Sequence, residues 1–301
     1  MTELHAIDMC QSLQNTLSIY GSELQVQSVF ASAVNIVGED LFFSILSDQH
    51  CLYPMSCRVG CMAPFTEYGI KADMSVTISD DSIRVMQASV RINLHSCKVR
   101  DLSIQSMNGL DSLKNRTNKT DILMELIREN GCREDLSTLV TGEYKNPYAE
   151  AVAKRLPELN KAIRECDNRA AELAGNIAGG GIGLTPSSDD LLVGYLSVFL
   201  AESKMRDNSH FEEVLKLTQA MGEKAAEHTN LISGAFLRQC GRGLLSEDMA
   251  ELIRTLYSSS EADDVRLSGQ RILKVGSTSG TDMLTGVVLA LLNLNAEERY
   301  L

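Results

Sequence analysis

Residues 176–200 read NIAGGGIGLTPSSDDLLVGYLSVFL, and this stretch decides how the second half of the chain is interpreted. Glycines at positions 179–181 and 183 lead directly into a Thr-Pro-Ser-Ser-Asp-Asp sequence that is typical of a helix start. Glycines allow backbone N–H groups to turn toward a ligand, and a helix that begins at the same place adds the positive end of its dipole. The stretch therefore predicts a site for a small polar ligand at a helix N-terminus.

The motif recurs near the C-terminus. The sequence SGTDMLTG at residues 279–286 lies over SSDDLLVG at residues 187–194, with Ser, Asp, Leu and Gly at the same offsets. Each copy runs into an apolar segment that is too short to span a bilayer, so each predicts a buried core helix. We expect the two helices to present their N-termini to one common place.

Helix capping is the alternative role for these polar residues. In one version Thr185 caps the first helix and Pro186 takes its first position. In the other, Ser187 caps it and Asp190 closes a capping box, which residues 279 and 282 would repeat. Capping does not require the glycines, which cost chain entropy, so close approach of the backbone to a small polar ligand explains them better.

Asp189 and Asp190 are adjacent carboxylates, and their charge repels a bound anion unless a cation intervenes. Three roles stay open for them: binding Mg²⁺, accepting hydrogen bonds from an amide or amino group of the substrate, and capping. The stretch is not a P-loop, because no Gly-Lys-Ser/Thr follows the glycines, and it also lacks the GxGxxG pattern of dinucleotide-binding proteins.

A third segment, HTNLISGAFLR at residues 228–238, places Thr229 and Ser233 on one helix face, with hydroxyls available to a ligand or to the preceding backbone turn. The candidate catalytic residues are Asp190 and Asp282. The candidate substrate- or anion-binding residues are the glycine and polar positions of the three segments: Gly181, Gly183, Thr185, Ser187, Ser188, Asp189, Thr229, Ser233, Ser279, Gly280 and Thr281. No metal ligand is assigned, and Mg²⁺ is the cofactor that these residues leave open.

The composition argues against nucleic acid and anionic membranes as binding partners. The chain has 301 residues, 44% of them hydrophobic, and a net charge of −12. It can bury a large core, whereas nucleic acid and anionic membrane surfaces would require basic patches. The N-terminus has no basic region followed by an apolar one, so we expect no signal peptide and a cytoplasmic protein.

The eight cysteines are expected to be mostly free and buried in such a reducing compartment. Zinc is disfavoured at His50, Cys51, Cys57 and Cys61, because no C-x-x-C pair occurs and a second ligand cluster is missing.

The pattern of the chain changes near residue 108. Short β-prone runs punctuated by turn residues predict strands at 24–30, 40–46, 56–61, 74–78, 83–85 and 99–104. Apolar residues three and four apart predict helices at 122–129, 147–174, 189–201, 211–228, 231–242, 247–257, 264–273 and 282–293. The fold class is therefore α+β: a β-rich N-terminal domain over residues 1–108, forming a small sheet or barrel, and a mainly α-helical domain over residues 109–301. The polar stretch 112–120 is interpreted as a linker or exposed loop.

Three of the quoted segments resemble the signature of a known family: GIGLTPSSDD at 181–190, the pair Thr229 and Ser233, and GSTSGTDMLTG at 276–286. They are similar to the family long called DUF2877, which includes the smaller subunit of bacterial oxamate carbamoyltransferase, an enzyme of anaerobic allantoin breakdown. Ser188 departs from the pattern, in which glycine is usual. The resemblance implies a complex with two companion subunits, one of them similar to acyl-CoA synthetases, acting on carbamoyl phosphate, oxamate and oxalurate.

Carbamoyl transfer fits residues that bind and orient. The acceptor nitrogen attacks the carbamoyl carbon and phosphate leaves, so the protein mainly positions the reactants and neutralises charge. Because no nucleophile motif is recognised, we expect the chain to be inactive without its companion subunits. Two other interpretations stay open: a non-catalytic or ligand-sensing partner subunit, and a Mg²⁺-dependent phosphoryl-transfer protein.

Overall fold

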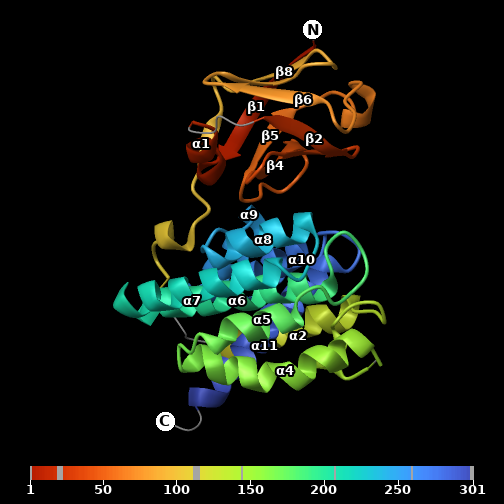
Figure 1. Ribbon diagram of the computed structural model, residues 1–301. Helices are drawn as coiled ribbons and strands as arrows, with labels where there is room; N and C mark the ends of the chain where they lie inside the picture. Colours follow the sequence, from red (N-terminus) through yellow and green to blue (C-terminus); the bar gives the residue numbers. More distant parts are fainter. Residues whose placement is uncertain are drawn as a thin grey trace. The chain divides into compact units, whose positions relative to one another are not determined.

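The computed structural model describes residues 2–18, 23–110, 116–143, 145–206, 208–258 and 260–298. The chain separates into two compact units, Met1–Leu102 and Ser103–Leu301. The first consists mainly of strands and the second of helices, which confirms the predicted α+β class (Figure 1). The sequence placed the boundary later, between residues 108 and 109.

The first unit is a closed sheet with one additional strand. Its strands follow the order β5-β4-β3-β2-β6-β7-β8-β1-β9, and β1 also pairs with β5, so eight strands close into a barrel and β9 lies beside β1. The elements described are β1 (Thr2–Cys10), α1 (Gln11–Leu17), β2 (Leu24–Val29), β3 (Ala33–Val37), β4 (Phe42–Ser47), β5 (Ser56–Gly60), η1 (Phe65–Glu67), β6 (Ser75–Ser79), β7 (Ser82–Val85), β8 (Val90–Asn93) and β9 (Lys98–Arg100). The predicted strand at 99–104 ends early, because Ile104 already belongs to a short 3-10 helix.

A buried ion pair strengthens the place where the barrel closes. Strands β1 and β5 run antiparallel, with a bulge between Ala6 and Asp8. Arg58 on β5 donates from Nε to Asp8 Oδ1 at 2.8 Å, and its Nη2 donates to the other carboxylate oxygen. The Asp8 side chain is only 5% exposed, so this forked contact compensates a carboxylate that has little access to water.

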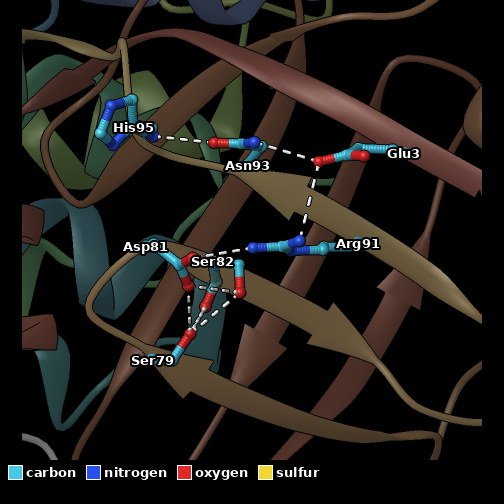
Figure 2. Close-up of polar contacts among 7 residues, drawn as sticks. All are labelled: Glu3, Ser79, Asp81, Ser82, Arg91, Asn93 and His95. Carbon is cyan, nitrogen blue, oxygen red and sulfur yellow. Dashed lines mark hydrogen bonds and ion pairs between the residues drawn. The ribbon is translucent and has the colours of Figure 1, made fainter.

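Side-chain hydrogen bonds fix the turn between β6 and β7 (Figure 2). The hydroxyls of Ser79 and Ser82 donate to Asp81 Oδ1 at 2.8 and 3.1 Å, and Arg91 donates to Asp81 Oδ2 at 2.8 Å. The Ser79 hydroxyl, then the Ser82 hydroxyl and the nearby arginine, lower the pKa of the Asp81 carboxyl. Arg91 also faces Glu3 at 3.9 Å, so this network links the turn to strands β8 and β1.

The second unit is built from helices around α6 and α11. Its described elements are η2 (Ile104–Ser106), α2 (Arg116–Asn130), α3 (Thr138–Thr141), α4 (Pro147–Arg164), α5 (Arg169–Ile177), α6 (Ser187–Arg206), α7 (Asn208–Ala226), α8 (Leu231–Gly241), α9 (Glu247–Leu256), α10 (Ala262–Ile272) and α11 (Ser279–Glu298). The apolar residues of α6 and α11 are mostly buried, as predicted for core helices. Within the described part of the chain, no helix has both the length and the apolar character needed to cross a membrane.

Two predictions about the helical region were wrong. The single helix predicted at 147–174 is two helices, because Cys166 adopts a left-handed backbone conformation (φ 48°) that ends α4. Residues 116–120 of the predicted linker belong to α2, while residues 112–115 lie outside the described residues. Lys119 in this segment is 4% exposed and donates to the carbonyls of Thr255 and Ser258 at 2.7 Å each. This polar segment therefore contributes a buried hydrogen-bonding side chain to the helical unit.

Helices α6 and α11 cross with reciprocal contacts. A Cβ atom on Gly194 would lie 2.0 Å from the carbonyl oxygen of Met283, and one on Gly286 would lie 2.0 Å from the carbonyl oxygen of Leu191. Gly194 and Gly286 occupy the same offset in the repeated motif, and so do Leu191 and Met283. The two motif copies are therefore structurally equivalent halves of one helix pair, related by an approximate two-fold axis.

The cysteines meet their prediction only in part. All eight are free thiols, as expected. Only Cys10, Cys57 and Cys240 are buried, and the other five are half-buried.

Candidate functional site

The starts of α6 and α11 converge, as the repeated motif predicted. The hydroxyl oxygens of Thr185 and Ser279 lie 3.0 Å apart, and Thr185 also donates to Asp190 Oδ2 at 2.9 Å. The Ser279 hydroxyl favours the ionised form of Asp190, and the Ser187 hydroxyl favours that of Asp282, so each serine lies near the aspartate of the other helix start. The side chains of Thr185, Ser279 and Asp190 thus form one hydrogen-bonded network that ties the two helix starts together. Asp282 Oδ2 has no hydrogen-bond partner among the described residues.

Burial changes the ionisation of both aspartates. Burial raises the pKa of Asp190 to about 7, against a smaller lowering effect of the Ser279 and Thr185 hydroxyls. Burial likewise raises the pKa of Asp282 to about 8, and the nearby charge of Asp190 adds to this rise. The side chains are almost inaccessible, with Asp190 4% and Asp282 0% exposed. At pH 7 the pair therefore carries less than half of the negative charge of two ionised carboxylates.

A backbone segment that the sequence did not single out supplies a hydrogen bond to Asp282. The Leu136 amide donates to Asp282 Oδ1 at 2.7 Å. The buried carboxylate of Asp135 holds this segment by accepting from the amides of Cys132 and Ser137, both at 2.9 Å. No sequence motif marks Leu136, because the group it contributes is an ordinary backbone amide.

Asp189 points away from this pair and joins three segments. Its Oδ1 accepts from the Gly179 amide at 2.7 Å, while Oδ2 accepts from the hydroxyls of Ser233, at 2.7 Å, and Thr229. The predicted hydroxyl pair on the third segment is thus bound to this carboxylate. Because three donors surround its two oxygens, Asp189 suits a structural tie better than the coordination of Mg²⁺.

The glycines have a different explanation from the one predicted for most of them. A Cβ on Gly179 would lie 2.3 Å from the His228 carbonyl oxygen, and one on Gly181 would lie 2.4 Å from the Ser187 amide nitrogen. The Gly180 amide donates to Ser188 Oγ at 2.8 Å. These glycines allow the loop to approach its own protein, so their presence does not require a ligand. Ser188, at 0% exposure, serves the same contact.

The outer part of the loop is available to a ligand. Gly183 has φ 110°, a conformation that favours glycine, and it is exposed together with Ile182. Within the described residues, the N–H groups of Gly181, Ile182 and Gly183 donate no hydrogen bond. Asn230 anchors this loop by donating to the Leu184 carbonyl at 2.8 Å while it caps α8. The sequence reasoning missed this asparagine, although an Asn before an apolar helical run is an N-cap signal.

The remaining predicted residues belong to the packing of α11. A Cβ on Gly280 would lie 2.1 Å from the Ile272 carbonyl oxygen, so this glycine allows α11 to pack against the end of α10. Thr281 is 5% exposed, and its carbonyl accepts from the Thr285 hydroxyl at 2.8 Å.

Two family models match the chain. The model described as oxamate carbamoyltransferase subunit AllH matches residues 177–291, which include both helix starts. The model described as the AllH family N-terminal domain matches residues 5–99, which lie in the barrel unit. No solved structure matches the chain.

Proposed function

The chain belongs to the AllH family of oxamate carbamoyltransferase subunits, and from this premise we propose that the paired starts of α6 and α11 bind the small anionic substrates of carbamoyl transfer. The observation that carries the proposal is the convergence of two helix N-termini, which the hydrogen bonds of Thr185 with Ser279 and Asp190 tie together. Helix N-termini attract anions through their dipoles and unpaired amides.

The raised pKa values remove an obstacle to anion binding. Ionised carboxylates beside a phosphate or an oxamate would oppose its binding. At pH 7 Asp190, with a pKa of about 7, is about half protonated, and Asp282, with a pKa of about 8, is mostly protonated. The pair therefore carries less than half of the negative charge of two ionised carboxylates, while Asp190 takes part in the contact between the helix starts.

The residues divide the chemistry of carbamoyl transfer between them. The unpaired amides of Gly181, Ile182 and Gly183 bind the charged oxygens of the phosphate or carboxylate group, and so stabilise the phosphate as it leaves. Thr185 and Ser279 are half-buried, so they form the edge of the network that reaches the surface. As the acceptor nitrogen forms its bond to the carbamoyl carbon and phosphate leaves, ionised Asp190 takes the proton of that nitrogen through the Thr185 hydroxyl, which suits a group whose pKa lies near neutrality.

The test uses the complex reconstituted with its companion subunits. Phosphate-dependent cleavage of oxalurate to carbamoyl phosphate is measured for the chain alone, for the complex, and for the complex carrying Asp190→Asn. We expect no turnover from the chain alone, and a loss of roughly a hundredfold or more in rate for Asp190→Asn with a nearly unchanged melting temperature. The matched control is Asp263→Asn, which removes an exposed carboxylate from the first turn of α10.

Burial favours one alternative, a non-catalytic subunit that stabilises its partners. Asp190 and Asp282 are 4% and 0% exposed, as expected of residues whose only role is to join two helices. In that case the Asp190→Asn complex turns over at the wild-type rate. Full turnover by the isolated chain would contradict both interpretations.

A further inference from the structure

A second cluster of reactive side chains lies in the helical unit, apart from the helix starts. Cys166 follows α4, while His210 and Glu213 lie one turn apart on α7. The thiol sulfur, an imidazole nitrogen and a carboxylate oxygen of these residues all lie within 4.8 Å of one another. We propose that Cys166, His210 and Glu213 form a zinc site that joins the turn after α4 to helix α7.

The donor set selects the metal. Thiolate, imidazole and carboxylate are the three protein ligands of Zn²⁺, and a hard cation such as Mg²⁺ would not select a thiolate. Zinc bonds of about 2.0–2.3 Å in tetrahedral geometry place ligand atoms roughly 3–4 Å apart. The observed separations therefore need only small side-chain rotations to close around an ion. Three protein ligands leave the fourth position to water.

The surroundings of the cluster provide room and charge for such an ion. His210 lines a cavity of about 310 Å³ together with Arg164, Glu202 and Ser203, which is large enough for a water ligand. Glu202 is a buried carboxylate, the type of group that commonly accepts a hydrogen bond from the second nitrogen of a ligating imidazole. Among the described residues, no lysine or arginine forms an ion pair with Glu213, so a cation would neutralise the cluster.

The backbone presents Cys166 in an unusual way. Its amide donates to the Ile163 carbonyl at 3.1 Å, and the Asp167 amide donates to the Ala162 carbonyl at 2.8 Å, which is the helix-ending arrangement that normally contains glycine. Cysteine occupies this position instead, with φ 48°. The turn thereby directs a thiol toward α7 from a position where a side chain is disfavoured.

The experiment measures metal binding by the full chain, which separates it from any test of carbamoyl transfer. The purified chain is stripped with a chelator and titrated with Zn²⁺ in competition with a chromophoric chelator, and then with Co²⁺. We expect one ion per chain and a thiolate-to-cobalt charge-transfer band. Cys166→Ser should abolish the band and weaken Zn²⁺ binding by more than the roughly 10–100-fold that loss of an outer hydrogen-bond partner costs.

Two further variants keep the result interpretable. Glu213→Gln changes an exposed side chain on α7, so it should fold normally and still weaken Zn²⁺ binding. Cys132→Ser removes a half-buried thiol outside the cluster and should leave both the band and the affinity unchanged. Unchanged affinity in Cys166→Ser and Glu213→Gln, or binding of Zn²⁺ without a fixed stoichiometry, would overturn the proposed site.

Discussion

Asp190 and Asp282 show how strongly the fold can alter a single residue. Burial holds the pKa of these carboxyls at about 7 and 8, far above the value of about 3.9 for an exposed aspartate. Between pH 4 and 8 the folded chain therefore keeps protons that the unfolded chain has released. The sign follows directly: the contribution of these two carboxyls to stability is greatest below about pH 4 and falls as the pH rises toward 8, by about 1.4 kcal/mol per pH unit for each retained proton.

Replacing both carboxyls by amides should flatten this pH dependence. Asn at positions 190 and 282 resembles protonated Asp but cannot ionise, so the double variant Asp190→Asn, Asp282→Asn should match the wild type at pH 5 and be relatively more stable at pH 8. Urea unfolding of the helical unit at both values measures the difference. An identical loss of stability in the two proteins would mean that the carboxyls are already ionised in the folded state.

Sequence reasoning at this scale identified the polar side chains but could not assign their partners. The repeat identified Asp190 and Asp282 together, because their offsets match. It could not separate Asp189, which ties the glycine loop to α8, from its neighbour Asp190, because adjacent helical residues face different neighbours only once the helices are packed. The contact of the Leu136 amide with Asp282 could not be predicted either, because it too depends on how the helices pack.

At the scale of helices, the close crossing of α6 and α11 reverses the usual effect of replacing a helical glycine by alanine. Glycine to alanine within a helix normally stabilises by about 1 kcal/mol. At Gly286 the new methyl group would lie 2.0 Å from a carbonyl oxygen of α6. We expect Gly286→Ala to destabilise the chain by about 3 kcal/mol or more, since the helices must separate to admit it.

Chemical denaturation provides the measurement, with Asn118→Ala as the control. Asn118 is exposed on α2, so its replacement should be neutral or slightly stabilising. A Gly286→Ala variant as stable as the wild type would show that the close crossing is not required.

Helix positions were largely predictable from apolar periodicity, whereas their ends were not. The break after α4 depends on a cysteine in a conformation that normally requires glycine, so no glycine or proline signals it. The start of α2 was read as a polar linker, because a lysine that donates to buried carbonyls looks the same in a sequence as one that faces water.

For the molecule as a whole, the important feature is that the two largest apolar clusters of the described residues lie one in each unit. One contains residues between Leu4 and Ile92, and the other contains residues between Ile104 and Leu294. We expect Arg58→Met to leave Asp8 buried without its partner and to destabilise the barrel unit by about 3–5 kcal/mol. Calorimetry should show the barrel transition lowered by more than about 10 °C, with the helical transition unchanged.

Arg84→Met, which removes an exposed arginine from β7, is the matched control and should leave both transitions in place. A single transition that moves as one in Arg58→Met would contradict independent cores.

The sequence did not show which strands pair to close the barrel. Short β-prone runs were recognised, but β1, β3 and β8 were missed, and two of these pair with strands far along the chain. The closing contacts of β1 with β5 and β8 depend on three-dimensional register, which local patterns do not encode.

The approximate two-fold axis between α6 and α11 has a consequence for ligand orientation. A perfectly symmetric receptor would hold an unsymmetric molecule in two opposite orientations at equal free energy. Here one half offers the half-buried hydroxyl of Thr185, while the corresponding half offers the fixed amide of Leu136. Because these two donors differ, the two orientations of a bound molecule differ in free energy. The segments around the repeated helix starts therefore decide which way the ligand binds.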